Sequence, residues 1–332
     1  MSLSTIAANN LLNLAFSATA WPGGAPGTVY FALFTSAPSA SGGGTEVSGG
    51  SYARVAVAVN TTNFPAITVP GNAMTNGTAI TFAKATAAWG TITYMGIYDA
   101  ASAGNLMFFA PLAAPVTPAV GNIVNWNIAD LSLSATGGLG NYLEMVLLNY
   151  LFAGLAFPTI ANHYLTLGTG ATAAGITGEI ATARKLVANN TSNWPAASNG
   201  IKTLTNDETF AAPTAGTYSY LGIYNASALN AVTLAAGATT NNSTTVTVTS
   251  TASVVAGMLI TGTGIPAGTF IASVSNGTTL VLSAVATATN TGLTLTATAA
   301  MLAFVPLNSA VTTNGTTDTP LVSSGTVTLS LN

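Results

Sequence analysis

The chain has 332 residues, enough for two domains of ordinary size, but only 5 of them are Lys or Arg and 8 are Asp or Glu. Charged residues therefore make up 4% of the chain, where about 25% is usual. The net charge of −3 excludes the basic surface that nucleic-acid binding requires, and zero Cys excludes disulfides and thiolate metal sites. A single His excludes every metal motif built on two histidines.

Two apolar segments predict helices. Residues 11–20 resemble part of an export signal, but no Lys or Arg precedes them, so we expect no cleaved signal. Residues 142–157 form the longest apolar stretch, and its apolar side chains recur at three- and four-residue steps. The stretch is shorter than the roughly 20 residues that cross a bilayer. It therefore predicts a buried helix, and we expect no membrane partner.

Strands are predicted after the first helix. Runs of β-branched or aromatic residues bounded by Gly, Pro, Asn and Ser predict strands over residues 29–34, 53–59, 79–83 and 91–98. A helix followed by such a set of strands predicts a β-sandwich-like domain with the helix packed on or beside it.

The second half of the chain repeats the first. Nine of fifteen positions are identical when residues 52–66 are aligned without gaps to residues 182–196. Two further matches follow the same order, residues 11–16 with 147–152 and residues 90–100 with 216–226. We therefore predict two tandem domains that share one fold and are related by a rigid-body rotation.

The second copy contains an insertion. The match stops after Ala226 and resumes where Phe109-Ala-Pro-Leu112 meets Phe304-Val-Pro-Leu307. The extra residues alternate Thr with Val or Leu and carry Gly and Pro as turn residues, which predicts short strands. The predicted fold is mainly β, with a first repeat domain at 1–138, a second at 139–229 and 300–332, and a small all-β insert at 230–299. Each repeat domain opens with a helix.

Few residues are suited to catalysis. His163 has no acidic partner or nucleophile at comparable spacing, so we expect a surface or hydrogen-bonded strand residue. Asp99, Asp130, Asp207 and Glu208 form no repeated carboxylate pair of the kind that a glycosidase needs, and the adjacent Asp207 and Glu208 predict a solvated turn. We predict no catalytic residue, no metal, no cofactor and no enzymatic activity.

An acid and a base are duplicated together. Glu46 precedes Arg54 in the first copy, and Glu179 precedes Arg184 in the second. In a chain so poor in charge, this repetition favours an intrachain ion pair that fixes a loop against its strand. A pair between subunits is the alternative, because Arg suits bidentate carboxylate contacts at either kind of site.

Three segments carry a resemblance to a known family: Ala32-Leu-Phe-Thr-Ser-Ala-Pro38, Gly43-Gly-Thr-Glu-Val-Ser-Gly-Gly-Ser-Tyr-Ala-Arg54 and Met95-Gly-Ile-Tyr98. They resemble tailed-bacteriophage virion proteins labelled as tail fibre, minor tail or head decoration proteins. The resemblance covers most of residues 1–135 and, more loosely, the second copy. Residues 257–268 look like a β-module that recurs in phage surface proteins. The resemblance implies a structural role in the virion, without enzymatic residues.

Two structural functions follow from this resemblance. The first is a capsid decoration or cement protein that binds the major capsid protein on the outside of the head, as a homotrimer. The second is a minor tail or tail-fibre protein that contacts the host surface. Compact repeated modules, without the short-period repeats of a fibre shaft, favour the first. Glycan binding by the insert has little support, because Phe270 is its only aromatic residue.

Overall fold

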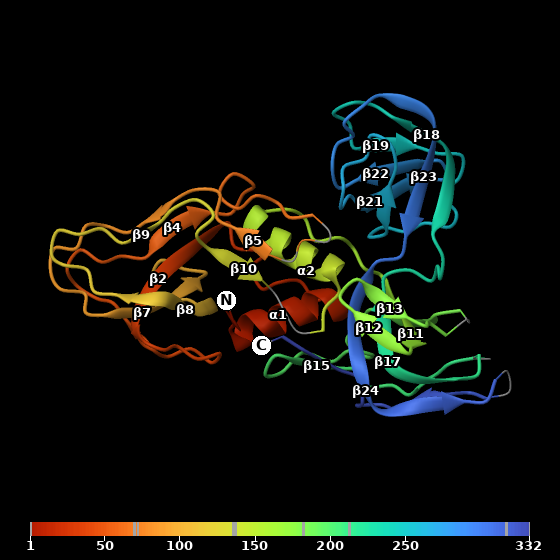
Figure 1. Ribbon diagram of the computed structural model, residues 1–332, viewed down its shortest axis with the longest axis horizontal. Coiled ribbons are helices and arrows are strands. Elements are labelled where there is room, and N and C mark those ends of the chain that lie inside the picture. The colour runs from red at the N-terminus through yellow and green to blue at the C-terminus, as the bar shows by residue number, and fades with distance from the viewer. Residues whose placement is uncertain are drawn as a thin grey trace.

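The computed structural model describes residues 2–68, 71, 73–134, 138–180, 183–211, 214–315 and 318–331. Two β-rich lobes lie along the long axis of the molecule, with two helices between them (Figure 1). The insert stands beside the second lobe on a narrow connection (Figure 1). Among the described residues, no helix is long and apolar enough to cross a bilayer. The mainly β fold with one helix at the start of each copy is confirmed.

The first repeat domain has one main sheet and two short ribbons. In the sheet, β4, β2, β7 and β8 are neighbours, with β1 added beside β8 and β3 beside β2. The ribbons pair β5 with β10 and β6 with β9. The elements are β1 (Ser2–Leu3), α1 (Thr5–Phe16), β2 (Thr28–Ser36), β3 (Thr45–Glu46), β4 (Val55–Ala58), β5 (Ala73–Thr75), β6 (Ile80–Thr81), β7 (Ile92–Tyr98), β8 (Leu106–Val116), β9 (Asn125–Trp126) and β10 (Ser132–Ser134).

The second repeat domain repeats the four central strands of the first. Its main sheet has the order β14-β11-β17-β24, without counterparts of β1 and β3, and its ribbons pair β12 with β13, β15 with β26 and β16 with β25. The elements are α2 (Asn141–Leu148), η1 (Asn149–Ala153), β11 (Asn162–Gly168), β12 (Gly170–Thr172), β13 (Gly175–Thr177), β14 (Lys185–Ala188), β15 (Ile201–Thr203), β16 (Glu208–Thr209), β17 (Gly216–Tyr224), β24 (Met301–Thr313), β25 (Leu321–Val322) and β26 (Thr328–Ser330).

The strands that follow Arg54 and Arg184 occupy the same place in the two sheets. β4 pairs with β2, which pairs with β7, and β14 pairs with β11, which pairs with β17. The aligned residues Val57 and Val187 lie opposite Val29 and His163. The duplication read from the sequence is therefore a duplication of structure. The second layer of each copy differs from a full sandwich sheet, because it consists of separate two-stranded ribbons.

Each helix is anchored to its own sheet at its start. The Ser4 amide donates to the carbonyl of Met107 on β8, at 2.8 Å. In the second copy, the Gly140 amide donates to the carbonyl of Leu302 on β24, also at 2.8 Å. Ser4 also caps α1, because its hydroxyl accepts from the Ala7 amide.

The end of each helix packs into the other repeat domain. The rings of Phe16 and Trp194 lie 5.4 Å apart, and those of the aligned residues Phe152 and Phe64 lie 5.2 Å apart. The two repeat domains thus exchange the ends of their helices. One hydrophobic core accordingly contains residues of both domains, from Leu3 to Leu331.

Hydrogen bonds repeat the same exchange. Asn13 Oδ1 accepts from the Ala197 amide at 2.7 Å, and Asn149 Oδ1 accepts from the Ile67 amide at 2.9 Å. These four residues are aligned in the repeat, Asn13 with Asn149 and Ile67 with Ala197. The predicted packing of each helix on or beside its own domain therefore applies to the start of the helix, whereas the end of each helix packs into the other domain.

The insert folds on its own core. Its single sheet has the strand order β20-β23-β18-β19-β22-β21. We call the two repeat domains together the body. A second hydrophobic core, separate from that of the body, lies in the insert and includes Val246, Ile260, Leu280 and Leu295. The strands are β18 (Val232–Thr239), β19 (Thr245–Thr247), β20 (Leu259–Thr261), β21 (Ile271–Asn276), β22 (Thr279–Leu282) and β23 (Asn290–Thr298).

The insert replaces a five-residue loop. In the first copy the Asn105 amide donates to Asp99 Oδ1, at 2.6 Å, and closes the loop of residues 100–104. In the second copy the Ala300 amide donates to Oδ1 of Asn225, at 2.8 Å, while the Asn225 amide donates to the Ala300 carbonyl. We call the two chain segments that enter and leave the insert its neck. Asn225 and Ala300 close this neck, as Asp99 and Asn105 close the short loop.

This neck generates a prediction. Replacing residues 226–299 with the sequence of residues 100–104 should leave a folded body, because the body and the insert have separate cores. Circular dichroism and a single cooperative thermal transition of the shortened chain would check it. As a control, the same five residues can replace residues 42–46. This variant loses Glu46, the partner of Arg54, so it should be less stable although its loop keeps the same length. A shortened chain that aggregates without cooperative unfolding would show that the body needs the insert.

Candidate functional site

A buried arginine clamps the short loop of the first repeat domain. Arg54 Nε donates to Glu46 Oε1 at 2.8 Å, and Nη2 to Oε2 at 2.7 Å. Its Nη1 donates to the carbonyls of Ala100 and Ala103 at 2.9 and 2.7 Å. The guanidinium carbon lies 3.5 Å from the ring centroid of Tyr98, a cation–π contact. One side chain thus joins an acid, an aromatic ring and two loop carbonyls.

The second repeat domain contains the same clamp at the neck of the insert. Arg184 Nε donates to Glu179 Oε1 at 2.7 Å, and Nη2 to Oε2 at 3.1 Å. Its Nη1 donates to the carbonyls of Ala226 and Ala228 at 3.1 and 2.7 Å. The guanidinium carbon lies 3.6 Å from the centroid of Tyr224. The structure thus brings each predicted acid and base together within one chain.

His163 lies in the pocket that receives the end of α1. The residue is fully buried on β11, and its Nε2 lies 3.1 Å from the carbonyl oxygen of Ala15. Its ring lies 5.0 Å from Phe16 and 5.5 Å from Trp194. Burial lowers the pKa of His163 to about 4, and the nearby Lys202 also lowers it. Of the two expected environments, the structure shows the buried strand position.

Lys202 is a buried cation that sequence reasoning missed. Its side chain on β15 is fully buried, and Nζ donates to Asn13 Oδ1 at 2.7 Å and to the hydroxyl of Ser17. Burial lowers the pKa of Lys202 to about 8. Its counterpart in the first copy is Met74, because in the strand register each of the two pairs with the central leucine of its partner strand.

The carboxylates that the sequence analysis considered as catalytic candidates bind nearby backbone amides or a lysine, and one of them differs from its predicted environment. Glu208 is buried on β16, where its Oε2 lies 3.7 Å from Lys185 Nζ, and burial raises its pKa. The predicted solvated turn is therefore wrong for Glu208, because a ribbon strand draws it inward. Asp207 accepts a hydrogen bond from the Ser324 amide, and Asp130 accepts one from the Asn127 amide. Within the described ranges, no three His, Cys, Asp or Glu residues gather as a metal site would require.

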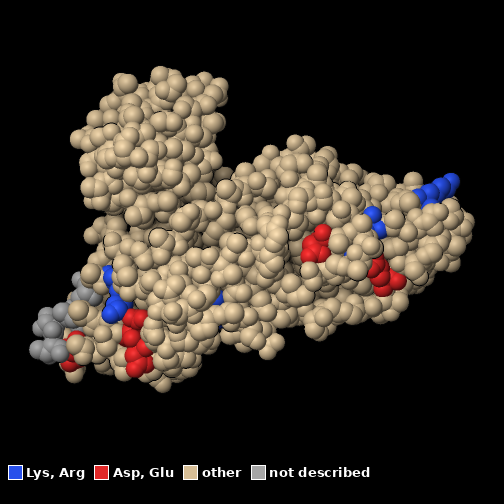
Figure 2. Space-filling model, turned by 180° about the vertical axis from the view of Figure 1, so that it is seen from behind, with Lys and Arg blue, Asp and Glu red and all other residues tan. Residues whose placement is uncertain are grey.

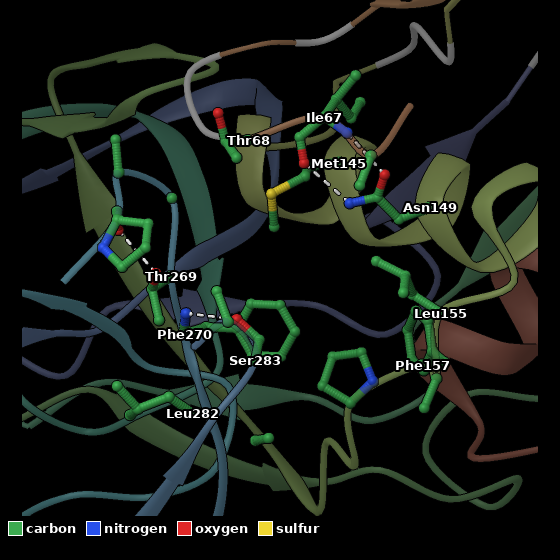
Figure 3. A pocket seen from close by; sticks show the side chains of 18 of the residues that line it. Ile67, Thr68, Met145, Asn149, Leu155, Phe157, Thr269, Phe270, Leu282 and Ser283 are labelled. Carbon is green, nitrogen blue, oxygen red and sulfur yellow. Dashed lines mark hydrogen bonds between the residues drawn. The ribbon is translucent and has the colours of Figure 1, made fainter. Parts of the chain in front are cut away.

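A cavity of about 500 Å³ lies where the first repeat domain, the end of α2 and the insert meet. Figure 3 shows Ile67, Met145, Leu155, Phe157 and Phe270 around it. Its labelled polar side chains are already engaged in part: Asn149 bonds to Ile67, and Ser283 accepts from the Phe270 amide. Its described lining residues are apolar or neutral and polar.

Comparison with known proteins agrees with the repeated geometry. A family model described as podophage GP4 fiber I protein gp80 matches residues 2–134 and, a second time, residues 138–262. The chain belongs to this family. The first match covers the first repeat domain, and the second begins where the second repeat domain begins and runs into the insert, which agrees with two tandem copies. A search of curated proteins found no match. The resemblance to tailed-phage structural proteins is thereby confirmed, and the gp80-family chain is a phage virion structural protein.

The clamp at the neck generates a prediction for this gp80-family chain. Arg184→Met should lower the free energy of unfolding by about 3 kcal/mol, because it leaves Glu179 and two carbonyls without their partner in a nearly buried site. Chemical denaturation measures this loss, and hydrogen exchange should rise at residues 226–228. Arg54→Met is the matched control, because it should increase exchange at residues 100–103 instead. A loss below about 1 kcal/mol would assign the pair to the weak surface class.

His163 predicts a pH dependence. Since its pKa is lower in the folded chain than the ordinary value of 6.5, the unfolded chain binds the extra proton between pH 6.5 and pH 4. The free energy of unfolding should therefore fall as the pH is lowered through this range, by on the order of 3 kcal/mol. His163→Val, which copies Val29 of the first domain, should remove that part of the slope. Urea denaturation at several pH values gives the free energy of unfolding of both proteins. If this free energy falls equally with pH in the two, His163 does not cause the pH dependence.

Proposed function

We propose that the protein is a fibre component on the exterior of a phage particle. The observation that carries the proposal is the double match to a family described as a fibre protein. The shape supports it, because the insert stands away from the body on a neck and offers a surface for contact with a host or with a neighbouring subunit (Figure 1).

The surface chemistry also supports a neutral partner. Residues 226–299 contain no Lys, Arg, Asp, Glu or His. Figure 2 shows the same poverty of charge over most of the rear face of the molecule. A glycan partner for the insert has little support, because Phe270 packs edge-on against Tyr142, with ring centroids 5.7 Å apart, and does not form an exposed sugar platform.

Self-association belongs to the same proposal. Val120, Ile123 and Ile128 are exposed by 64, 55 and 63%, all within the segment between β8 and β10. Contiguous exposed apolar side chains are typical of an interface, and these three are the side chains that we propose to form one. We propose a homotrimer whose contacts are apolar and rich in Thr and Asn, since the chain has few charges for ion pairs. Such contacts depend little on salt.

A capsid decoration or cement protein that binds the major capsid protein is the second candidate. It is favoured by the compact modules, since the two repeat domains share one core and show none of the short-period repeats of a shaft. The fibre proposal does not require a shaft within this chain, since the family description names a fibre protein without specifying a shaft.

Immunogold labelling of intact particles with antibody against this chain distinguishes the two candidates. Label on fibres or the tail, with a bare head surface, is the expected result. Label spread over the head would contradict the fibre proposal and support the decoration function. Particles that carry the chain without residues 226–299 provide the second measurement. If the insert makes the contact with the host, these particles should assemble normally and lose adsorption.

A further inference from the structure

The two pockets that receive the exchanged helix ends occupy equivalent places but differ in chemistry. The pocket of the first domain, which receives the end of α2, is apolar at the positions where the pocket of the second domain is polar. Strand register and the sequence repeat pair these positions as Val29 with His163, Val59 with Asn189, and Met74 with Lys202.

The helices differ at the matching place. Asn13 and Asn149 are the same residue and accept from equivalent backbone amides, so they do not distinguish the pockets. Ser17, just after α1, is aligned with Ala153 at the end of η1. The hydroxyl of Ser17 accepts from Lys202 Nζ and donates to the Trp194 carbonyl at 2.9 Å. A methyl group at this position could do neither.

We propose that Lys202 is a specificity determinant that directs the end of α1 into the second repeat domain and excludes α2 from it. Among the described residues, the side-chain acceptors of Lys202 are Asn13 and Ser17, both supplied by the α1 segment. With α2 in that pocket, Ala153 would leave the buried ammonium one acceptor short, which is costly for a charge. With α1 in the apolar pocket, the Ser17 hydroxyl would meet the thioether of Met74.

The polar pocket is poorly suited to a purely stabilising role. Three of its buried atoms have no hydrogen-bond partner among the described residues: His163 Nδ1, Asn189 Oδ1 and Trp194 Nε1. Buried polar groups that lower stability are retained in other proteins where they select one partner among similar ones. This chain contains that situation, since it has two similar helices and two similar pockets.

The test exchanges the determinants within the full chain. The double variant Ser17→Ala with Ala153→Ser exchanges the residues that distinguish the two helix ends. The double variant Lys202→Met with Met74→Lys exchanges the residues that distinguish the two pockets. Each double variant should raise the unfolding equilibrium constant at least tenfold. The quadruple variant should return to within threefold of the unchanged chain, because helix and pocket match again. Urea denaturation gives the constants.

A second measurement locates the effect. Ser17→Ala alone should increase hydrogen exchange in residues 5–16 at least tenfold and leave residues 141–153 unchanged. Lys202→Met should abolish this sensitivity to the residue at position 17. If the effects of the two double variants simply add in the quadruple variant, or if Lys202→Met destabilises the chain equally with Ser or Ala at position 17, Lys202 is only a packing residue and the proposal is overturned.

Discussion

The exchange of helix ends is the interaction on which the rest of the structure depends. Because Phe16 packs on Trp194 and Phe152 packs on Phe64, the core of each repeat domain is closed by the other domain's helix. The body therefore has one hydrophobic core, although it consists of two tandem copies of one domain. The buried core of the insert is separate from it, although Leu259 and Phe270 of the insert pack against the core of the two repeat domains.

Two of the ion pairs of the chain hold loops. Arg54 and Arg184 each bind a carboxylate, lie over a tyrosine ring and hold two backbone carbonyls. The same clamp holds a loop of five residues in one copy and the neck of the insert in the other. A loop fixed so firmly at its base tolerates a large change beyond it, since the strands on both sides keep their register. This explains how a whole module occupies one loop of a phage structural protein.

The two repeat domains have similar helices and similar pockets, so a choice exists of which helix end enters which pocket. The two copies differ where helix and pocket meet, with Lys202 and Ser17 on one side and Met74 and Ala153 at the equivalent positions. Connection lengths also differ, because residues 17–27 join α1 to β2 whereas residues 154–161 join η1 to β11. Local chemistry and connectivity thus act on the same choice.

The sequence by itself determined the duplication, four strands of the first copy, the presence of an insert and the acid–base pairs, because each leaves a local or repeated pattern; it did not determine β8, which completes the main sheet. Glu46 with Arg54 was predictable since Glu179 with Arg184 repeats it. Only the tertiary structure decided which domain each helix closes, because an apolar helix face has the same period whichever sheet it covers. For the same reason Lys202 escaped notice: its strand looks ordinary, and its burial depends on Asn13 and Ser17, about 190 residues away in the chain.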